Sequence, residues 1–164
     1  MKKILILIMI GLSFNGRADT DVVENSPLCK SIEKVVGISP KNATKQLGAP
    51  TNKSEKDVKN PYVENAKDKE IILNYPGGYT VFRYLSHNNK YILLRAKLNT
   101  KSFNASLNET IPSDLKKVIL KHGKPDEELN GAIRYYCTFE ANEWANIYHK
   151  NGKVTDVEFI GYLD

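Results

Sequence analysis

The stretch Gly123–Leu163, GKPDEELNGAIRYYCTFEANEWANIYHKNGKVTDVEFIGYL, decides the predicted fold. It begins with Gly-Lys-Pro, which typically ends a helix, because glycine accepts the left-handed backbone there and proline cannot continue the helix. Three strand-like runs follow, Ile133–Phe139, Trp144–His149 and Val154–Tyr162. Between the last two runs, Asn151–Gly152 predicts a β-hairpin with a type I′ turn, which needs φ > 0 at both central residues.

The same pattern occurs earlier in the chain. Leu47–Gly48–Ala49–Pro50 matches His122–Gly123–Lys124–Pro125, and three more strand-like runs follow it: Ile71–Tyr75, Tyr79–Leu85 and Tyr91–Leu98. The sequence therefore predicts an α+β fold of two tandem helix–three-strand units, which form an antiparallel sheet with helices on one face.

This reading divides the chain into four parts: a signal peptide at 1–18, an arm at 19–37 with a short helix, a first unit at 38–107 and a second unit at 108–164. Ser39–Pro40 predicts the start of the first unit's helix, with Ser39 as N-cap. Ser113 or Thr110 is expected to cap the helix of the second unit. Thr51–Glu70 is rich in charge and has only a short counterpart in the second unit, so it is expected to be an inserted surface loop.

The N-terminus predicts export. Lys2 and Lys3 precede the apolar run Ile4–Leu12, and the small residues Gly16 and Ala18 suit a signal-peptidase site with cleavage after Ala18. The apolar run is too short to span a membrane as a mature helix. We therefore expect a periplasmic or secreted protein with no stable membrane anchor, and the alternatives are an uncleaved anchor or a buried helix.

Charge and composition argue against a nucleic-acid partner. Loss of Lys2, Lys3 and Arg17 with the leader leaves 21 of the 24 basic residues against 19 acidic ones, so the net charge falls from +5 to +2. No basic stripe is interleaved with aromatic residues, which disfavours nucleic-acid binding. The hydrophobic fraction of 41% and charged fraction of 26% are those of an ordinary globular protein.

The chain has two cysteines, Cys29 and Cys137. In an oxidising compartment a lone pair is expected to form a disulfide, which here would tie the arm to the first strand of the second unit. The alternative is two free buried thiols.

The sequence lacks the motifs of the common catalytic and metal sites. His87, His122 and His149 have no partner at metal-ligand spacing, and there is no nucleophile elbow, phosphate loop or Cys-x-x-Cys. Asp126–Glu127–Glu128 lacks the spacing of a calcium loop and is expected to be solvated. We therefore predict a protein that is not an enzyme and has no metal or cofactor.

Strand alternation predicts which side chains face the core. The inward positions are Thr80, Phe82, Tyr84, Ile92, Leu94, Ala96, Ala145, Ile147, His149, Thr155, Val157 and Phe159. The opposite face then carries Val81, Arg83, Leu85, Tyr91, Leu93, Arg95, Lys97, Trp144, Asn146, Tyr148, Asp156, Glu158, Ile160 and Tyr162, with Tyr136 beside them.

An outer face of this composition is typical of protein-binding hot spots, which are rich in Tyr, Trp and Arg. The predicted binding residues are Arg83, Arg95, Tyr136, Trp144, Tyr148 and Tyr162. The alternative is that the arm or the insertion covers this face, or that these are ordinary strand aromatics.

The tandem pattern after a signal peptide resembles the β-lactamase inhibitor protein family, and also the single-unit SmpA/OmlA (BamE) proteins of outer-membrane assembly. Leu47–Gly48–Ala49–Pro50, His122–Gly123–Lys124–Pro125 and the Lys150–Phe159 hairpin carry this resemblance. It implies two α/β units side by side, one continuous antiparallel sheet with helices on one face, and protein binding through the open sheet face.

The function expected from the sequence is that of an exported, monomeric protein-binding module of inhibitor, immunity or envelope-assembly type. Its partner is expected to be another protein. The alternatives are a small exported hydrolase and a small-ligand or lipid-binding protein.

Overall fold

The computed structural model describes residues 26–105, 111–138 and 140–161. In chain order its elements are α1 (Pro27–Val36), α2 (Pro40–Leu47), β1 (Asn52–Lys59), β2 (Lys67–Tyr75), β3 (Gly78–Leu85), β4 (Lys90–Asn99), α3 (Thr100–Ala105), α4 (Leu115–His122), β5 (Glu127–Leu129), β6 (Ala132–Tyr136), β7 (Trp144–Lys150) and β8 (Lys153–Ile160). The predicted signal peptide and its cleavage site lie outside the described residues.

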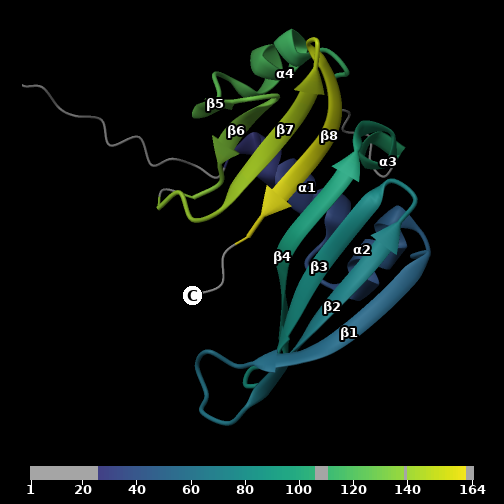
Figure 1. The fold of residues 1–164 in the computed structure, drawn as a ribbon, viewed down its shortest axis with the longest axis vertical. Helices are drawn as coiled ribbons and strands as arrows, with labels where there is room; N and C mark the ends of the chain where they lie inside the picture. Colours follow the sequence, from purple (N-terminus) through teal and green to yellow (C-terminus); the bar gives the residue numbers. More distant parts are fainter. Residues whose placement is uncertain (1–25, 106–110, 139, 162–164) are drawn as a thin grey trace, which may run out of the picture.

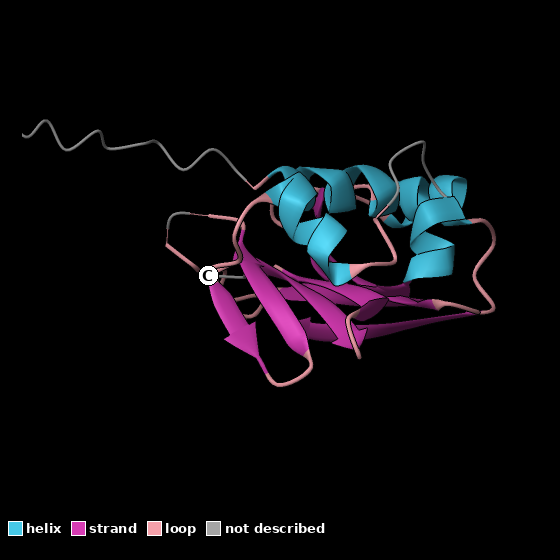
Figure 2. Ribbon diagram, turned by 90° about the horizontal axis from the view of Figure 1, so that it is seen from above, coloured by secondary structure: helices cyan, strands magenta, loops and turns pink. Residues whose placement is uncertain are grey.

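All eight described strands form one antiparallel sheet, in the order β1-β2-β3-β4-β8-β7-β6-β5 (Figure 1). The central pair is β4 and β8, which are joined by pairing from Arg95↔Ile160 to Asn99↔Asp156. The described helices lie together on one side of the sheet (Figure 2).

The fold is α+β, but the prediction of two tandem helix–three-strand units is wrong. The chain forms a single eight-stranded sheet with four short helices among the described residues. One hydrophobic cluster joins residues from both halves of the chain, including Leu28 of α1, Phe82 of β3 and Phe159 of β8. Burial of these groups in one shared core makes the sheet a single packing unit.

The charged segment Thr51–Glu70 is not the surface loop that its composition predicted. Asn52–Lys59 forms the edge strand β1, which pairs along its whole length with β2, and only the tip of the segment connects the two. Its side chains are nearly all exposed, so the ladder hydrogen bonds hold the strand in place. Charged residues, Lys above all, are common on edge strands because they discourage pairing with another chain.

The local turn and helix-end signals are confirmed, with the exception of one cap. Asn151 and Gly152 have φ of 51° and 74°, as a type I′ hairpin requires. Gly48 and Gly123 end α2 and α4 with positive φ, and the Ser39 side chain accepts a hydrogen bond from the backbone N–H of Asn42. For α4 the expected cap is wrong, because Asp114 caps it instead.

Two β-bulges shift the predicted core pattern. In β4, Arg95 pairs with Val81 of β3 and Leu93 pairs with the next residue, Phe82, so Leu94 is an extra residue. Leu93, not Leu94, therefore packs against the core. In β8, Thr155 is the extra residue; it is exposed, and Val154 is buried in its place. An extra residue reverses alternation on one side of the bulge.

Helix α1 and the disulfide hold the arm to the sheet. Leu28, Ile32, Val35 and Val36 on one stripe of α1 are fully buried. As predicted, Cys29 of α1 forms a disulfide with Cys137. Cys137 follows β6, and the two Cα atoms are 5.7 Å apart. A disulfide is compatible with an extracellular or periplasmic location. Among the described helices, none is long and apolar enough to cross a membrane.

Candidate functional site

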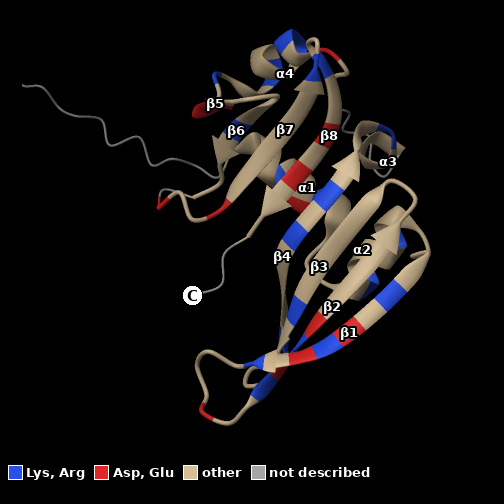
Figure 3. Cartoon of the chain, viewed as in Figure 1, with Lys and Arg blue, Asp and Glu red and all other residues tan. Residues whose placement is uncertain are grey.

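The open face is the side of the sheet opposite the described helices. Strand alternation places Glu158 of β8 on this face, since its neighbours Val157 and Phe159 point into the core. Asn146 and Tyr148 of β7 and Lys97 of β4 lie on it for the same reason, because Ala145, Ile147, Ala96 and Leu98 are in the core. Figure 3 shows basic residues along β4 next to an acidic position on β8. These side chains meet where the two halves of the sheet join.

Glu158 is the centre of a polar network on the open face. Its side chain is only 1% exposed. Oε1 accepts hydrogen bonds from Nε of Arg95, at 2.8 Å, and from the Arg95 Nη2. Oε2 accepts from the Tyr148 hydroxyl at 2.5 Å and from Nδ2 of Asn146 at 3.4 Å. Both carboxylate oxygens are therefore satisfied, as a buried charge requires.

The network keeps Glu158 ionised. Burial raises the pKa of its carboxyl, but the hydrogen bonds from Tyr148, Arg95 and Asn146 and the charge of Arg95 outweigh burial, so its pKa lies below the ordinary 4.5. The pKa of Arg95 is raised by its hydrogen bond to Glu158. Burial and the bond to Glu158 raise the pKa of Tyr148. At neutral pH the site contains an ionised Arg95–Glu158 pair with a neutral phenol beside it.

A second polar group extends the network toward β5. Arg134 of β6 donates from Nε to Oδ1 of Asn146 and from Nη1 to Oε2 of Glu127, both at 3.0 Å. Oε1 of Glu127 accepts from the Tyr136 hydroxyl, and this hydrogen bond is the first cause of the raised pKa of Tyr136. The guanidinium of Arg134 lies over the Trp144 ring, 5.0 Å from its centroid.

Two more cation–π contacts involve residues of β4, and one of them, between Lys97 and Tyr148 of β7, joins the two halves of the sheet. The Lys97 ammonium is 4.4 Å from the centroid of the Tyr148 ring, and the Arg95 guanidinium is 5.8 Å from that of Tyr79 on β3. Together these contacts define what we call the Glu158 network: Tyr79, Arg95, Lys97, Glu127, Arg134, Tyr136, Trp144, Asn146, Tyr148 and Glu158.

The structure brings four of the six predicted binding residues into this network: Arg95, Tyr136, Trp144 and Tyr148. Arg83 lies on β3 opposite Ile92, outside the network, and its Nε is buried without a partner among the described residues. Tyr162 lies outside the described residues. Tyr91, expected on the outer face, instead lines a cavity beside α2, because the β4 bulge reverses the alternation before it.

Arg134, Glu127 and Tyr79 are members of the site that the sequence did not predict. Glu127 was expected in a solvated loop, but it lies in the short edge strand β5 and pairs with Arg134. The alternation of Ile133, Arg134 and Tyr135 was an available signal for Arg134, since the two neighbours are buried in the core.

No described group resembles a catalytic triad or a metal site. The group most like a catalytic site contains Asn60, Asp68 and Ser86, away from the Glu158 network. There Oδ1 of the buried Asp68 accepts hydrogen bonds from Asn60 Nδ2 at 2.8 Å and from the Ser86 hydroxyl at 3.2 Å. Ser86 thus donates to a carboxylate and not to a histidine base, which a serine nucleophile needs. The described part of the chain holds no cluster of three potential metal ligands.

The chain matches no protein-family model, no curated protein and no solved structure. The resemblance to the β-lactamase inhibitor protein and SmpA/OmlA families therefore stays a prediction.

The Glu158 network should contribute measurably to stability. Replacement of Glu158 by Gln keeps the shape but leaves Arg95 without its ion pair, and Arg95 is 48% exposed, so water offsets part of the loss. We expect a decrease of about 1–3 kcal/mol in the free energy of unfolding at pH 7. Urea unfolding of the variant and wild type measures it. Glu55→Gln, in the exposed Lys53–Glu55 pair, is the matched control and should have little effect.

The effect should disappear at acid pH. Because the folded pKa of Glu158 is below 4.5, the carboxylate contributes stability above that value and loses its contribution as pH falls through the folded pKa. Wild type should therefore lose stability more steeply than Glu158→Gln below about pH 4.5. Equal slopes for the two proteins between pH 7 and pH 3 would show that Glu158 is not held ionised by its partners.

Proposed function

We propose that the protein is an exported protein-binding module of inhibitor, immunity or envelope-assembly type, and that it binds its partner through the open face around the Glu158 network. The observation that carries the proposal is the gathering of Trp144, Tyr148, Tyr136 and Arg95 on a face with no described helix over it. Binding hot spots are enriched in these residue types.

The side chains of the face are already held in place. Tyr148 and Arg95 are bound to Glu158, and Tyr136 and Arg134 are bound to Glu127. A partner that docks here would immobilise few free rotamers, and side-chain ordering is a major cost of association. Preorganisation of this kind supports a binding role for the face.

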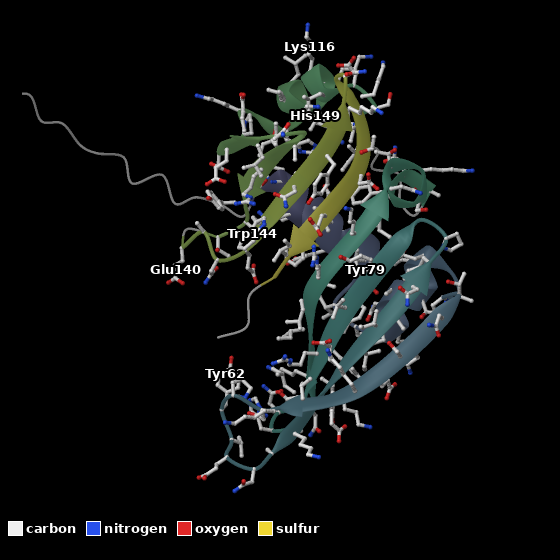
Figure 4. The ribbon with its side chains drawn as sticks, in the orientation of Figure 1. Tyr62, Tyr79, Lys116, Glu140, Trp144 and His149 are labelled. Carbon is white, nitrogen blue, oxygen red and sulfur yellow. A yellow bond between two sulfur atoms is a disulfide. The ribbon has the colours of Figure 1, made fainter. Side chains whose placement is uncertain are left out.

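The charged segment Thr51–Glu70 does not cover the Glu158 network, so the face is open to a partner on that account. The tip of the charged segment, with Tyr62, lies at the far end of the sheet from Trp144 (Figure 4). There the Tyr62 ring packs edge-on against His87, with centroids 5.5 Å apart.

Charge on the open face favours a partner surface of mixed sign. Arg95 and Lys97 lie on β4, whereas Glu127 is on β5 and Glu140 and Glu143 follow β6 (Figure 3). Arg95 is paired with Glu158, and Glu127 is paired with Arg134, so these four charges largely cancel within the face. Complementary basic and acidic patches on the partner would fix its orientation across the sheet.

Trp144 is the expected anchor. It is half-buried, and its indole Nε1 has no solvent contact and no partner among the described residues. Trp144→Ala should weaken partner binding by about 2 kcal/mol or more, roughly 30-fold. The loss of stability should stay below the about 3–5 kcal/mol of a fully buried tryptophan, because Trp144 is only partly buried.

The experiment is capture from an envelope extract with the immobilised protein, followed by titration of the captured partner against wild type and variants. Tyr91→Ala is the matched control, because Tyr91 is an exposed aromatic residue on the other side of the sheet. Equal affinity for wild type, Trp144→Ala and Tyr91→Ala would contradict the proposal. Turnover of a hydrolase substrate that one His or Asp substitution abolishes would favour the enzyme alternative.

A further inference from the structure

A cavity of about 560 Å³ lies on the helix side of the sheet, between α2 and the strands. Its apolar wall consists of Pro40, Pro50, Leu73 and the ring of Tyr91, from α2, the α2–β1 connection, β2 and β4. This volume is within the range of small-molecule sites, which are mostly apolar with a few polar groups that fix orientation.

The charged groups of the cavity are all cations. Lys41 and Lys45, one turn apart on α2, line it together with Lys53 of β1, and none of the described lining residues is Asp or Glu. Lys53 is paired with Glu55 at 2.7 Å, but Lys41 and Lys45 form no ion pair with any described residue. An apolar wall with two unpaired ammonium groups at its rim suits an organic anion.

We propose that this cavity binds a small, free organic anion with an apolar aromatic or aliphatic body and one carboxylate or sulfonate group. The body packs against Leu73 and the Tyr91 ring, and the acid group lies between Lys41 and Lys45. The site is independent of the open face, because the sheet separates α2 from the Glu158 network. Loss of either activity would therefore leave the other intact.

The test uses two fluorescent probes with the same ring system. 8-Anilinonaphthalene-1-sulfonate carries the anionic group, and N-phenyl-1-naphthylamine lacks it. We expect saturable binding of the sulfonate to the purified protein, at least about tenfold tighter than the uncharged probe. Added salt should weaken the sulfonate complex and leave the uncharged probe nearly unaffected.

Charge reversal on α2 locates the site. Lys41→Glu/Lys45→Glu should weaken sulfonate binding at least about tenfold. Lys116→Glu/Lys117→Glu on α4 makes the same change of charge on another exposed helix, and Trp144→Ala removes the main aromatic residue of the open face; both should change the affinity less than about twofold. If the first variant does not fold, Lys41→Gln/Lys45→Gln tests the same contact with a smaller expected loss.

The proposal would be overturned by no saturable sulfonate binding, by equal affinity for the two probes, or by equal affinity of the α2 and α4 variants for the sulfonate. Loss of sulfonate binding in Trp144→Ala would overturn it as well, because it would place the probe on the open face.

Discussion

Removal of the Cys29–Cys137 disulfide is expected to lower the free energy of unfolding by about 4–5 kcal/mol. The bond joins residues 108 apart. A crosslink that closes so long a loop strongly restricts the unfolded chain, and the loop-entropy relation gives a stabilisation of that size. The melting temperature should fall by roughly 10 °C or more in a chain of this length. Thermal unfolding of Cys29→Ala/Cys137→Ala measures the loss.

Reductant supplies the control for this prediction. Wild type should melt lower after reduction, whereas the double alanine variant should not respond, since it has no bond to break. Both cysteines are in the disulfide, so unfolded, unreduced protein should have no thiol to alkylate. Two thiols that react with iodoacetamide in the unfolded, unreduced protein would contradict the bond.

Phe159→Ala is expected to cost about 3–5 kcal/mol of stability, because it leaves a cavity in the core. Phe159 of β8 lies between Ala96 of β4 and Ala145 of β7, and all three side chains are buried. These alanines are too small to fill the space that the ring leaves. Ile147→Ala, in the neighbouring strand, should cost about 2–5 kcal/mol for the same reason.

Ile160→Ala is the matched control, because Ile160 follows Phe159 in the same strand and points to the opposite face. It is partly exposed and should cost about 1 kcal/mol. Urea unfolding of the three variants would compare them directly. A loss for Ile160→Ala as large as that for Phe159→Ala would mean that the two faces of β8 are assigned the wrong way round.

The open face shows how far local pattern can predict a site. Alternation along β7 and the end of β8 correctly separated Ala145, Ile147, Val157 and Phe159 in the core from the face that carries Trp144. It failed where a bulge intervenes, at Leu94 and Thr155. A bulge depends on how two strands meet, and nothing in the alternation of either strand alone marks it.

The sequence by itself determined the local structure of this protein. Glycines at 48 and 123 end helices because they reach the left-handed backbone at low cost, Ser39 caps α2, and Asn151–Gly152 makes the hairpin. The cysteine pair was also predictable, because a predicted export signal and two cysteines leave one pairing.

Tertiary structure alone decided the single sheet, the edge strand β1 and the Glu158 network. Strand β1 buries almost nothing, so its own side chains carry no strand signal, and ladder hydrogen bonds to β2 select its conformation. Arg95 and Glu158 are 63 residues apart and meet only because β4 pairs with β8. Contacts of that kind depend on the register between distant strands, which is fixed by burial of the shared core and not by either segment alone.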